Sequence, residues 1–320
     1  MKSFNVKQFI KKYAIYLVLI ALIIIFSIAS PQFLRVSNIV NVVRQASMLG
    51  IASVGMIFVM IIGGIDLSVG SMVTFVNIIV AYFMVNMGIH PVLSALIGIA
   101  AATLIGFFNG WVVANIKIPP LIVTLATQII FEGWAYIIAG GMPIFGFPKS
   151  FAVLGQGYVG IIPIPVIIMV ICLIVGSFIL NKTFFGRHFY AVGSNAEASE
   201  LSGVRVKRVH YLAYSLCGFF AGLSGVVTLS RTNSGQVTAG LGFEFDVISA
   251  LVLGGVSVTG GAGSISCAVA GILIMQILSN GFVLCGISTY LQMVIKGCVL
   301  LVAVGFDMIQ RMKQNTVKKA

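Results

Sequence analysis

Five ionisable residues lie within or beside long apolar runs of this 320-residue sequence. An unpaired charged side chain is costly at the centre of a lipid bilayer, and such residues commonly line a polar pathway or pair with one another. We therefore take each of them as a candidate for a pathway or a gate in a membrane. They are Asp66, Glu132, Glu244, Asp246 and Lys296.

Two of these residues suggest a pairing. Glu132 lies in QIIFEGWAY and Lys296 in YLQMVIKGCVLL, and at about 1.5 Å of rise per residue both reach a similar depth in the membrane. One hypothesis is therefore a Glu132–Lys296 ion pair. The alternative is that Lys296 extends outward to the membrane surface while Glu132 caps an outer vestibule.

Glu244 and Asp246 open an apolar run in GFEFDVIS. Carboxylates are favoured at the start of a helix by its dipole and by its free backbone amides, which is the structural interpretation. The functional interpretation is that they line an outer mouth or meet a delivery protein. The sequence leaves both interpretations open.

Asp66 lies in GGIDLSVG, residues 63–70, in a region with neither Lys nor Arg between Arg44 and Lys117. The glycines predict a break between two helices. Asp66 and Ser68 are predicted to accept hydrogen bonds from amides that the break exposes. The alternative is a role for Asp66 in a pathway or in the switch between its states.

The segment IIGGIDLSVG (61–70) is similar in sequence to VLGGVSVTGG (252–261). Both segments follow one apolar run and precede another. Either glycine-rich turns between spans look alike by chance, or the two are related helix breaks from a duplicated unit, as transporter folds often contain. The alignment pairs Gly63 with Gly254, Gly64 with Gly255, Asp66 with Ser257, Ser68 with Thr259 and Gly70 with Gly261.

Composition places these residues in an integral membrane protein. Hydrophobic residues make up 59% of the chain and charged residues 8%, which is more apolar surface than one soluble core can hide. The apolar runs reach about 20 residues without period-2 alternation, so they predict an all-α polytopic fold. Ten spans are predicted, at about 14–30, 46–63, 70–88, 92–114, 119–139, 161–180, 209–230, 245–258, 264–284 and 288–308.

The net charge of +12 indicates topology rather than a nucleic-acid partner. Basic residues lie in short segments between spans and in the tails, and the positive-inside rule places the N-terminus in the cytoplasm. Counting spans puts Lys117, the basic segment 181–208 and the C-terminus on the same side. We predict one transmembrane domain over residues 1–320, with cytoplasmic tails at 1–13 and 309–320.

Motifs for catalysis or metal binding are missing from the sequence. It contains no G-x-x-x-x-G-K-[ST], no G-x-S-x-G and no H-E-x-x-H, and its histidines lie in loops or at span edges. The five cysteines lack CxxC spacing and are interpreted as packing residues. The sequence therefore predicts neither an enzyme nor a metal or cofactor bound by this chain.

The longest hydrophilic interruption, residues 181–210, contains a signal for a short helix. Ser194 and Glu197 have the S-x-x-E spacing of a capping box, and Gly203 offers a stop. A helix of about seven residues is marginal in water because nucleation is costly. It therefore needs the membrane domain or a partner protein to hold it.

Four segments together resemble the permease subunits of bacterial ATP-driven monosaccharide importers, the group of the ribose, galactose, xylose and autoinducer-2 permeases, with the ribose permeases nearest. The resemblance runs over nearly the whole chain. One position departs from it, because Glu132 stands where these permeases often have Arg. The resemblance is carried by GGIDLSVG (63–70), GRHFYAVGSNAEASELSGV (186–204), FEFDVISALVLGGVSVTGGAGSI (243–265) and TYLQMVIKGCVLLVAV (289–304).

The resemblance implies a ten-helix fold of the vitamin B12-permease type in the bacterial inner membrane. It implies a second permease as a homodimeric or related partner, an ATPase subunit that uses ATP and magnesium beneath the membrane, and a periplasmic sugar-binding protein above it. It also implies that the short helix is a coupling helix that docks into the ATPase. The docking residues would be Ser194, Asn195, Glu197, Glu200, Leu201 and Gly203.

A neutral monosaccharide would need hydroxyls, amides and a few carboxylates along its path, without a strong field of either sign. An importer of nucleosides or of another small polar solute is an alternative. A self-sufficient secondary transporter is another, although it has no need of a coupling helix. The further pathway candidates are Ser68, Asn77, Thr124, Thr127 and Gln128.

Overall fold

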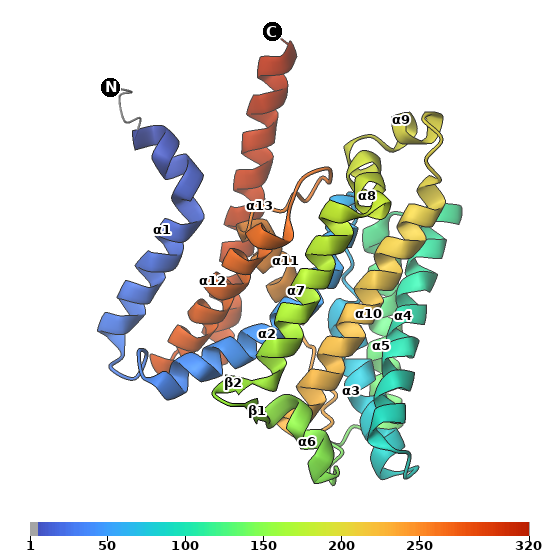
Figure 1. Cartoon of the computed structure of the whole chain (residues 1–320), viewed down its shortest axis with the longest axis vertical. Helices are drawn as coiled ribbons and strands as arrows, with labels where there is room; N and C mark the ends of the chain where they lie inside the picture. The colour runs from blue at the N-terminus through green and yellow to red at the C-terminus, as the bar shows by residue number, and fades with distance from the viewer. Residues whose placement is uncertain (1–5, 320) are drawn as a thin grey trace.

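The computed structural model describes the backbone of residues 6–319 and the side chains of residues 15–309. The described chain is built of helices and one short two-stranded hairpin (Figure 1). The elements are α1 Val6–Ala29, α2 Val36–Ile61, α3 Val69–Val85, α4 Pro91–Asn115, α5 Pro120–Ala139, α6 Lys149–Gln156, β1 Tyr158–Val159, β2 Ile162–Pro163, α7 Ile164–Lys182, α8 Phe184–Ser194, α9 Ala196–Leu201, α10 Val206–Thr232, α11 Phe243–Leu253, α12 Ile265–Leu284 and α13 Thr289–Lys319.

Among the described residues, seven helices are long and apolar enough to cross a membrane: α2, α4, α5, α7, α10, α12 and the Thr289–Ile309 part of α13. The predicted all-α polytopic class is confirmed. The other three predicted spans coincide with shorter apolar helices, which are Ile15–Ala29 of α1, α3 and the 11-residue α11. A helix therefore lies at each predicted position, and the count of ten crossings stays a prediction.

The two ends of the bundle differ (Figure 1). The start of α1, the end of α13 and α9 lie at one end, which we call the α9 end. The short helix α6 and the β1–β2 hairpin lie at the opposite end, which we call the α6 end. The chain segments that were predicted to share one side of the membrane thus lie at the same end of the molecule.

Helix α2 forms the centre of the bundle. Every residue from Ala46 to Ile61 is buried, and the helix packs against α7, α10, α11 and α12. A helix that is apolar on all sides is stable when it is covered on all sides. By contrast, α5 and α13 leave many large apolar side chains exposed, which suits helices that face lipid or another protein chain.

Helices α4 and α10 approach closely because small residues line their interface. A Cβ added at Gly110 would lie 2.8 Å from the carbonyl oxygen of His210, and one added at Gly222 would lie 3.0 Å from the Cβ of Ala102. Small residues let membrane helices pack backbone to backbone. This packing brings Asn109 of α4 against the break between α2 and α3.

The basic segment 181–208 contains two helices where the sequence predicts one. Sequence analysis missed α8, which is amphipathic: Phe189 and Val192 are buried against the bundle, while Arg187 is exposed. The side chain of Thr183 caps its start by accepting a hydrogen bond from the amide of Gly186 at 3.4 Å. Its last residue leads directly into α9.

Candidate functional site

The first break is organised by Asp66, which is fully buried. Its Oδ1 accepts hydrogen bonds from the Ser68 amide at 2.9 Å and from the Ser68 hydroxyl at 2.5 Å. The hydroxyl of Ser68 accepts in turn from the side-chain amide of Asn109 at 2.9 Å. Asp66 thus accepts from an amide that the break exposes, whereas Ser68 bonds to side chains and not to an exposed amide. Sequence analysis missed Asn109, an isolated amide in the apolar α4.

The glycines before Asp66 end α2. Gly63 has a φ of +81°, a left-handed conformation that favours glycine. Its amide donates to the carbonyl of Met60 at 2.9 Å, and the amide of Gly64 donates to that of Val59 at 2.9 Å. These two bonds form a Schellman cap, which satisfies the last carbonyls of a helix and turns the chain away.

The second break repeats this cap after α11. Gly255 has a φ of +90°, and its amide donates to the carbonyl of Val252 at 2.9 Å. The structural equivalent of Gly63 is therefore Gly255, and the alignment that paired Gly63 with Gly254 is wrong by one residue at this point. Gly254 allows close packing instead, since a Cβ there would lie 2.5 Å from the carbonyl oxygen of Cys267.

The polar residues that follow the two caps also correspond. The hydroxyl of Ser257 accepts from the Thr259 amide at 3.1 Å, with the same two-residue reach as the bond from Ser68 to Asp66. The two pairs therefore occupy equivalent turns, as the sequence alignment has them. The first turn carries a carboxylate and the second a hydroxyl, so the geometry is shared while the charge is not.

The two breaks touch each other. The amide of Gly261 donates to the carbonyl of Ile61 at 2.8 Å. Gly260 lies so close to Gly63 that an added Cβ would be 2.8 Å from its backbone nitrogen. The contact is made by backbone atoms, which leaves no space for a side chain between the breaks.

The end of α8 packs against the same point. A Cβ added at Gly193 would collide with the carbonyl oxygen of Ile61, and one added at Gly261 would lie 2.9 Å from the hydroxyl oxygen of Ser194. Three separate chain segments therefore meet where only glycine fits. We call this contact the glycine junction, and it consists of Gly63, Gly193, Gly260 and Gly261.

Two side chains also join α8 to the breaks. The hydroxyl of Tyr190 donates to the carbonyl of Gly263 at 2.7 Å, and burial raises the pKa of that hydroxyl, so it stays protonated and available as a donor. The ring of Phe189 lies 5.5 Å from the ring of Phe58 in α2. Helix α8 is therefore attached to both breaks.

Helix α9 begins after Asn195, and the prediction of Ser194 as its cap is wrong. Ser194 is the last residue of α8, and its hydroxyl donates to the carbonyl of Tyr190 at 2.8 Å. Asn195 has an extended backbone, and its side-chain oxygen accepts from the amide of Ala198 at 2.9 Å. Because Ser194 remains helical, the cap position falls to the next residue.

The surface of α9 points away from the bundle. Leu201 is 91% exposed, Glu197 and Glu200 are also exposed, and only Ser199 of this described helix is buried. The chain leaves the helix at Gly203, which has a φ of +86°. An apolar side chain and two carboxylates are therefore available to another protein.

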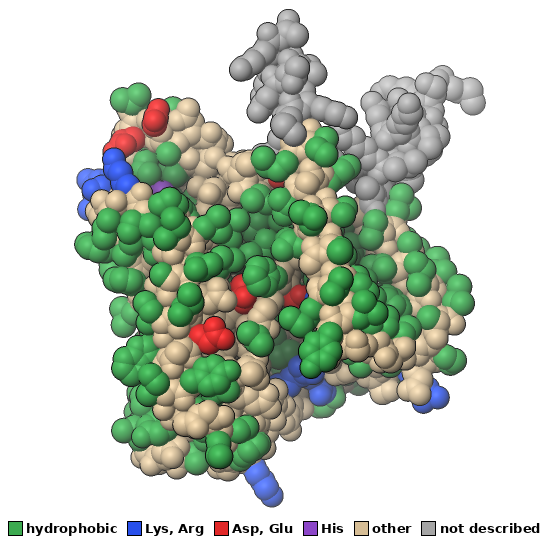
Figure 2. Space-filling model, turned by 180° about the vertical axis from the view of Figure 1, so that it is seen from behind, with side chains coloured by type: hydrophobic (Ala, Val, Ile, Leu, Met, Phe, Trp, Pro, Cys, Tyr) green, Lys and Arg blue, Asp and Glu red, His purple; other side chains and the backbone are tan. Residues whose placement is uncertain are grey.

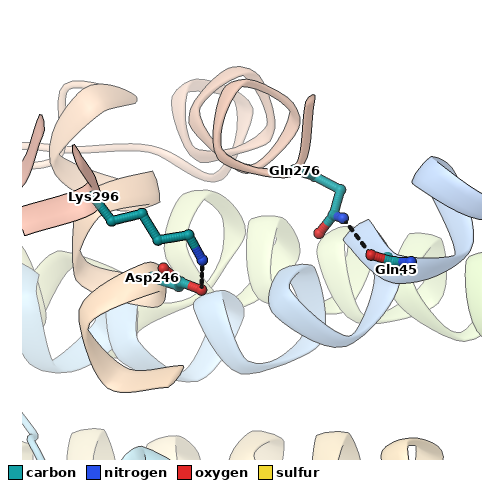
Figure 3. Close-up of polar contacts among 4 residues, drawn as sticks. All are labelled: Gln45, Asp246, Gln276 and Lys296. Atoms are coloured by element: carbon teal, nitrogen blue, oxygen red, sulfur yellow. Dashed lines mark hydrogen bonds and ion pairs between the residues drawn. The ribbon is translucent and has the colours of Figure 1, made fainter. Parts of the chain in front are cut away.

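Lys296 pairs with Asp246 (Figure 3). The ammonium of Lys296 on α13 lies 2.7 Å from Oδ2 of Asp246 on α11. The hypothesis that Lys296 pairs with Glu132 is therefore wrong. Equal depth says nothing about position around the bundle, and α13 packs against α11 while α5 packs against α3 and α4.

Glu244 is nearly fully buried at the start of α11. Its Oε1 accepts from the side-chain amide of Gln128 on α5 at 3.1 Å, and Glu132 lies within electrostatic range. A Cβ added at Gly70 would collide with the Glu244 carboxylate. The structure thus brings four of the predicted site residues together between α3, α5 and α11. Figure 2 shows a few acidic side chains in the middle of a mainly apolar face of the molecule.

The side chains of three further pathway candidates form hydrogen bonds with backbone groups. Oδ1 of Asn77 accepts from the amide of Gln236 at 2.8 Å. The hydroxyl of Thr124 lies 2.9 Å from the carbonyl oxygen of Pro120 in its own helix and 3.3 Å from that of Ile65 in the first break. Thr127 donates to carbonyls of its own helix. These three side chains are used for structure.

Sequence analysis missed two amide pairs between α2 and α12. Nε2 of Gln276 donates to Oε1 of Gln45 at 2.8 Å (Figure 3), and Asn38 and Asn280 exchange two bonds at 2.9 and 3.0 Å. Interhelical amide bonds are a recurring way to fix helices in a membrane. The signal in the sequence is an amide isolated in or beside an apolar run.

A model of a protein family matches most of the chain. The family is described as the permease component of branched-chain amino acid transport systems, and the match covers residues 38–304. The chain belongs to this family of permeases. The matched part of the permease contains both breaks, the glycine junction and α9.

The permease is also similar to named transport proteins over nearly its full length. It is 41% identical to the ribose import permease protein RbsC of Bacillus subtilis over 91% of each chain. It is 39% identical to RbsC of Haemophilus influenzae over 95% of each chain. It is 38% identical to the L-arabinose transport system permease protein AraH of Escherichia coli, over 98% of this permease and 96% of the relative. No solved structure matches it significantly.

Proposed function

We propose that this permease is the membrane-spanning subunit of an ATP-driven importer that carries a monosaccharide, a ribose-like pentose or a hexose, into the cytoplasm. The observation that carries the proposal is its similarity to permeases named for ribose import and L-arabinose transport, which extends over 91% or more of the chain. The substrate class comes from those relatives, while the family description names branched-chain amino acids. The substrate is therefore the part to test first.

The proposed importer lies in the bacterial inner membrane with both termini in the cytoplasm. Residues 1–320 form one domain with ten crossings of the vitamin B12-permease type, cytoplasmic tails at 1–13 and 309–320, and a cytoplasmic coupling loop at 181–208. The basic character of that loop supports this orientation, because positive charge is retained on the cytoplasmic side. In this orientation the α9 end faces the cytoplasm and the α6 end faces the periplasm.

Three partners complete the proposed importer. An ATPase subunit, which holds the ATP and magnesium, binds α9; the exposed Leu201 and Glu200 support this docking. A periplasmic sugar-binding protein delivers the sugar at the α6 end. A second copy of the permease pairs with the first, and the exposed apolar faces of α5 and α13 offer an interface.

In the proposed mechanism, α8 carries movement from the ATPase to the membrane. A shift of α9 moves α8, and α8 contacts Ile61 through Gly193 and bonds to Gly263 through Tyr190. The two breaks are the points where α2 can change its angle to α3, and α11 its angle to α12. Movement at element ends of this kind is a common way to open and close a site.

The proposed gate consists of the polar pairs that bridge α5, α11 and α13. Gln128 and Glu244 join α5 to α11, and Asp246 and Lys296 join α11 to α13. These side chains bond to one another when the path is closed and are suited to bond sugar hydroxyls when it opens. Affinity resides mainly in the binding protein, so the permease holds the sugar weakly.

Reconstitution in proteoliposomes tests the proposal. The permease, its ATPase and its binding protein should together take up labelled ribose or arabinose when ATP is supplied, and removal of any one component should abolish uptake. Uptake of a nucleoside or of a branched-chain amino acid in place of every sugar would overturn the substrate class. Ion-driven uptake by the permease alone would establish a secondary transporter instead.

A further inference from the structure

A cavity of about 310 Å³ lies between α2, α10, α11 and α12. It is near the α6 end, because it reaches the last turn of α10, against which α6 packs. Small-ligand sites start at about this volume and combine apolar walls with a few polar groups. Met48, Val73 and Phe243 contribute apolar lining. The polar lining includes Gln45, Thr228, Arg231, Asp246, Gln276 and Ser279.

The polar groups of the cavity retain unused hydrogen-bonding capacity. The bond from Gln276 to Gln45 uses one donor and one acceptor, so the Gln45 amide nitrogen and the Gln276 oxygen remain for a ligand. Lys296 occupies Oδ2 of Asp246, so Oδ1 remains as well. Figure 3 shows these two pairs on neighbouring helices.

Arg231 adds a cation to the lining of the cavity. Within residues 15–309 its guanidinium makes no ion pair, and its bond is to the sulfur of Met48 at 3.7 Å. A half-buried guanidinium offers several N–H donors in a fixed plane. Those donors suit two adjacent oxygen atoms of a ligand.

This combination matches a neutral sugar better than an amino acid. Each sugar hydroxyl both donates and accepts, which amides, a guanidinium and a carboxylate can satisfy together. The C–H face of a sugar can lie on Phe243. An amino acid could pair its carboxylate with Arg231, but its ammonium would find no free carboxylate in the lining, because Lys296 already neutralises Asp246.

We infer that this cavity is a monosaccharide-binding site within each permease chain, occupied after the sugar leaves the binding protein. The inference rests on the proposed function and adds the place where the sugar binds. Gln45, Arg231 and Gln276 are the residues that contact the sugar.

Protection of an introduced cysteine tests the site without transport. Ser279→Cys places a thiol in the lining, and its reaction with a small methanethiosulfonate is followed by peptide mass spectrometry on the permease in nanodiscs. Ribose or arabinose should slow the reaction by 1 + [sugar]/Kd, which is roughly threefold at twice Kd. The exposed Cys285 is an internal control whose rate should not change.

Matched variants assign the effect to the cavity. Gln276→Leu in the Ser279→Cys background should abolish protection, whereas Gln32→Leu, at an exposed position between α1 and α2, should leave it intact. Protection by a sugar acid or a branched-chain amino acid in place of the neutral sugars would overturn the inference. The inference would also be overturned if sugar did not slow the labelling of Ser279→Cys although the complete importer takes up that sugar. The proposed function would not be affected by that result.

Discussion

The amide of Gly261 donates a hydrogen bond to the carbonyl of Ile61 at 2.8 Å. Ile61 is the last residue of α2, and Gly261 lies in the break between α11 and α12, so the bond joins the two helix breaks directly. Gly193 at the end of α8 packs against the same carbonyl of Ile61. A displacement of either break therefore reaches the other through backbone atoms.

Gly193→Ala should open the glycine junction. The added Cβ would collide with the carbonyl oxygen of Ile61, and overpacking of this kind costs about 1–3 kcal/mol. We expect a lower unfolding temperature and slower ATP-driven uptake, because the collision displaces the segment that joins α8 to the first break. Thermal unfolding in detergent and uptake by the full importer measure the two effects.

Gly305→Ala is the matched control for Gly193→Ala. Gly305 lies in α13 and an added Cβ would meet no atom within 4 Å, so stability and uptake should stay near those of the unmodified permease. Normal uptake by a stable Gly193→Ala permease would contradict the role of the junction in transmission.

Asp66→Asn should keep most of the transport activity. The asparagine oxygen can still accept the bonds that Asp66 accepts from Ser68, so the turn is retained. Asp66→Ala should instead cost about 1–3 kcal/mol, because it leaves a buried amide and hydroxyl without an acceptor. A folded Asp66→Asn permease without transport would show that the charge acts in the pathway or in the switch.

Ser257→Ala provides the corresponding measurement at the second break. It removes the single acceptor for the Thr259 amide, so the cost should be smaller, about 0.5–1.5 kcal/mol. Urea or thermal unfolding of the three variants under one condition ranks them. A larger loss for Ser257→Ala than for Asp66→Ala would show that the second turn contributes more to stability.

Asp246 and Lys296 should be coupled in a double-mutant cycle. Each is about one-quarter exposed and the two charges are 2.7 Å apart. Asp246→Asn and Lys296→Met should each destabilise the permease, and together they should cost less than the sum by about 0.5–3 kcal/mol. Thermal unfolding of the four proteins gives the coupling energy.

The same cycle with Glu132→Gln and Lys296→Met is the control. Since Lys296 is paired with Asp246, these two changes should add within about 0.5 kcal/mol. Coupling between Glu132 and Lys296 equal to that of Asp246 and Lys296 would contradict the observed pairing.

Leu201→Ser should weaken binding of the ATPase without affecting the fold. Leu201 is 91% exposed, so its loss removes no internal packing, whereas loss of a central interface residue commonly costs about 2 kcal/mol, or roughly thirtyfold in affinity. Copurification and ATPase stimulation measure the effect. Leu241→Ser, at an exposed position between α10 and α11, is the control, and equal losses in both variants would contradict the docking role.

The fold class and the positions of the long apolar helices could be predicted because they depend on local composition. A run of about 20 apolar residues identifies a helix wherever it packs. The Glu132–Lys296 pairing failed because depth along an axis does not fix position around a bundle. Asp246 was already a candidate, but only the packing of α11 against α13 shows that Lys296 reaches it.

The glycine junction illustrates a second limit. Gly63 and Gly261 were both identified as parts of breaks, and their sequences even aligned. Their contact with each other and with Gly193 depends on three chain segments that are distant in sequence. Glycine has no side chain whose chemistry could indicate a partner. The sequence therefore predicts where the chain turns, but not which segments contact each other at the turns.

A contact without side chains also has no rotamers with which to absorb a small movement. When α8 shifts, the Ile61 and Gly261 segments must shift with it, and neither can lag while a side chain reorients. The two halves of the permease would then bend in step. Simultaneous bending keeps an importer from being open to both sides of the membrane at once. The glycine junction would thereby protect the cell against leakage of ions and sugar.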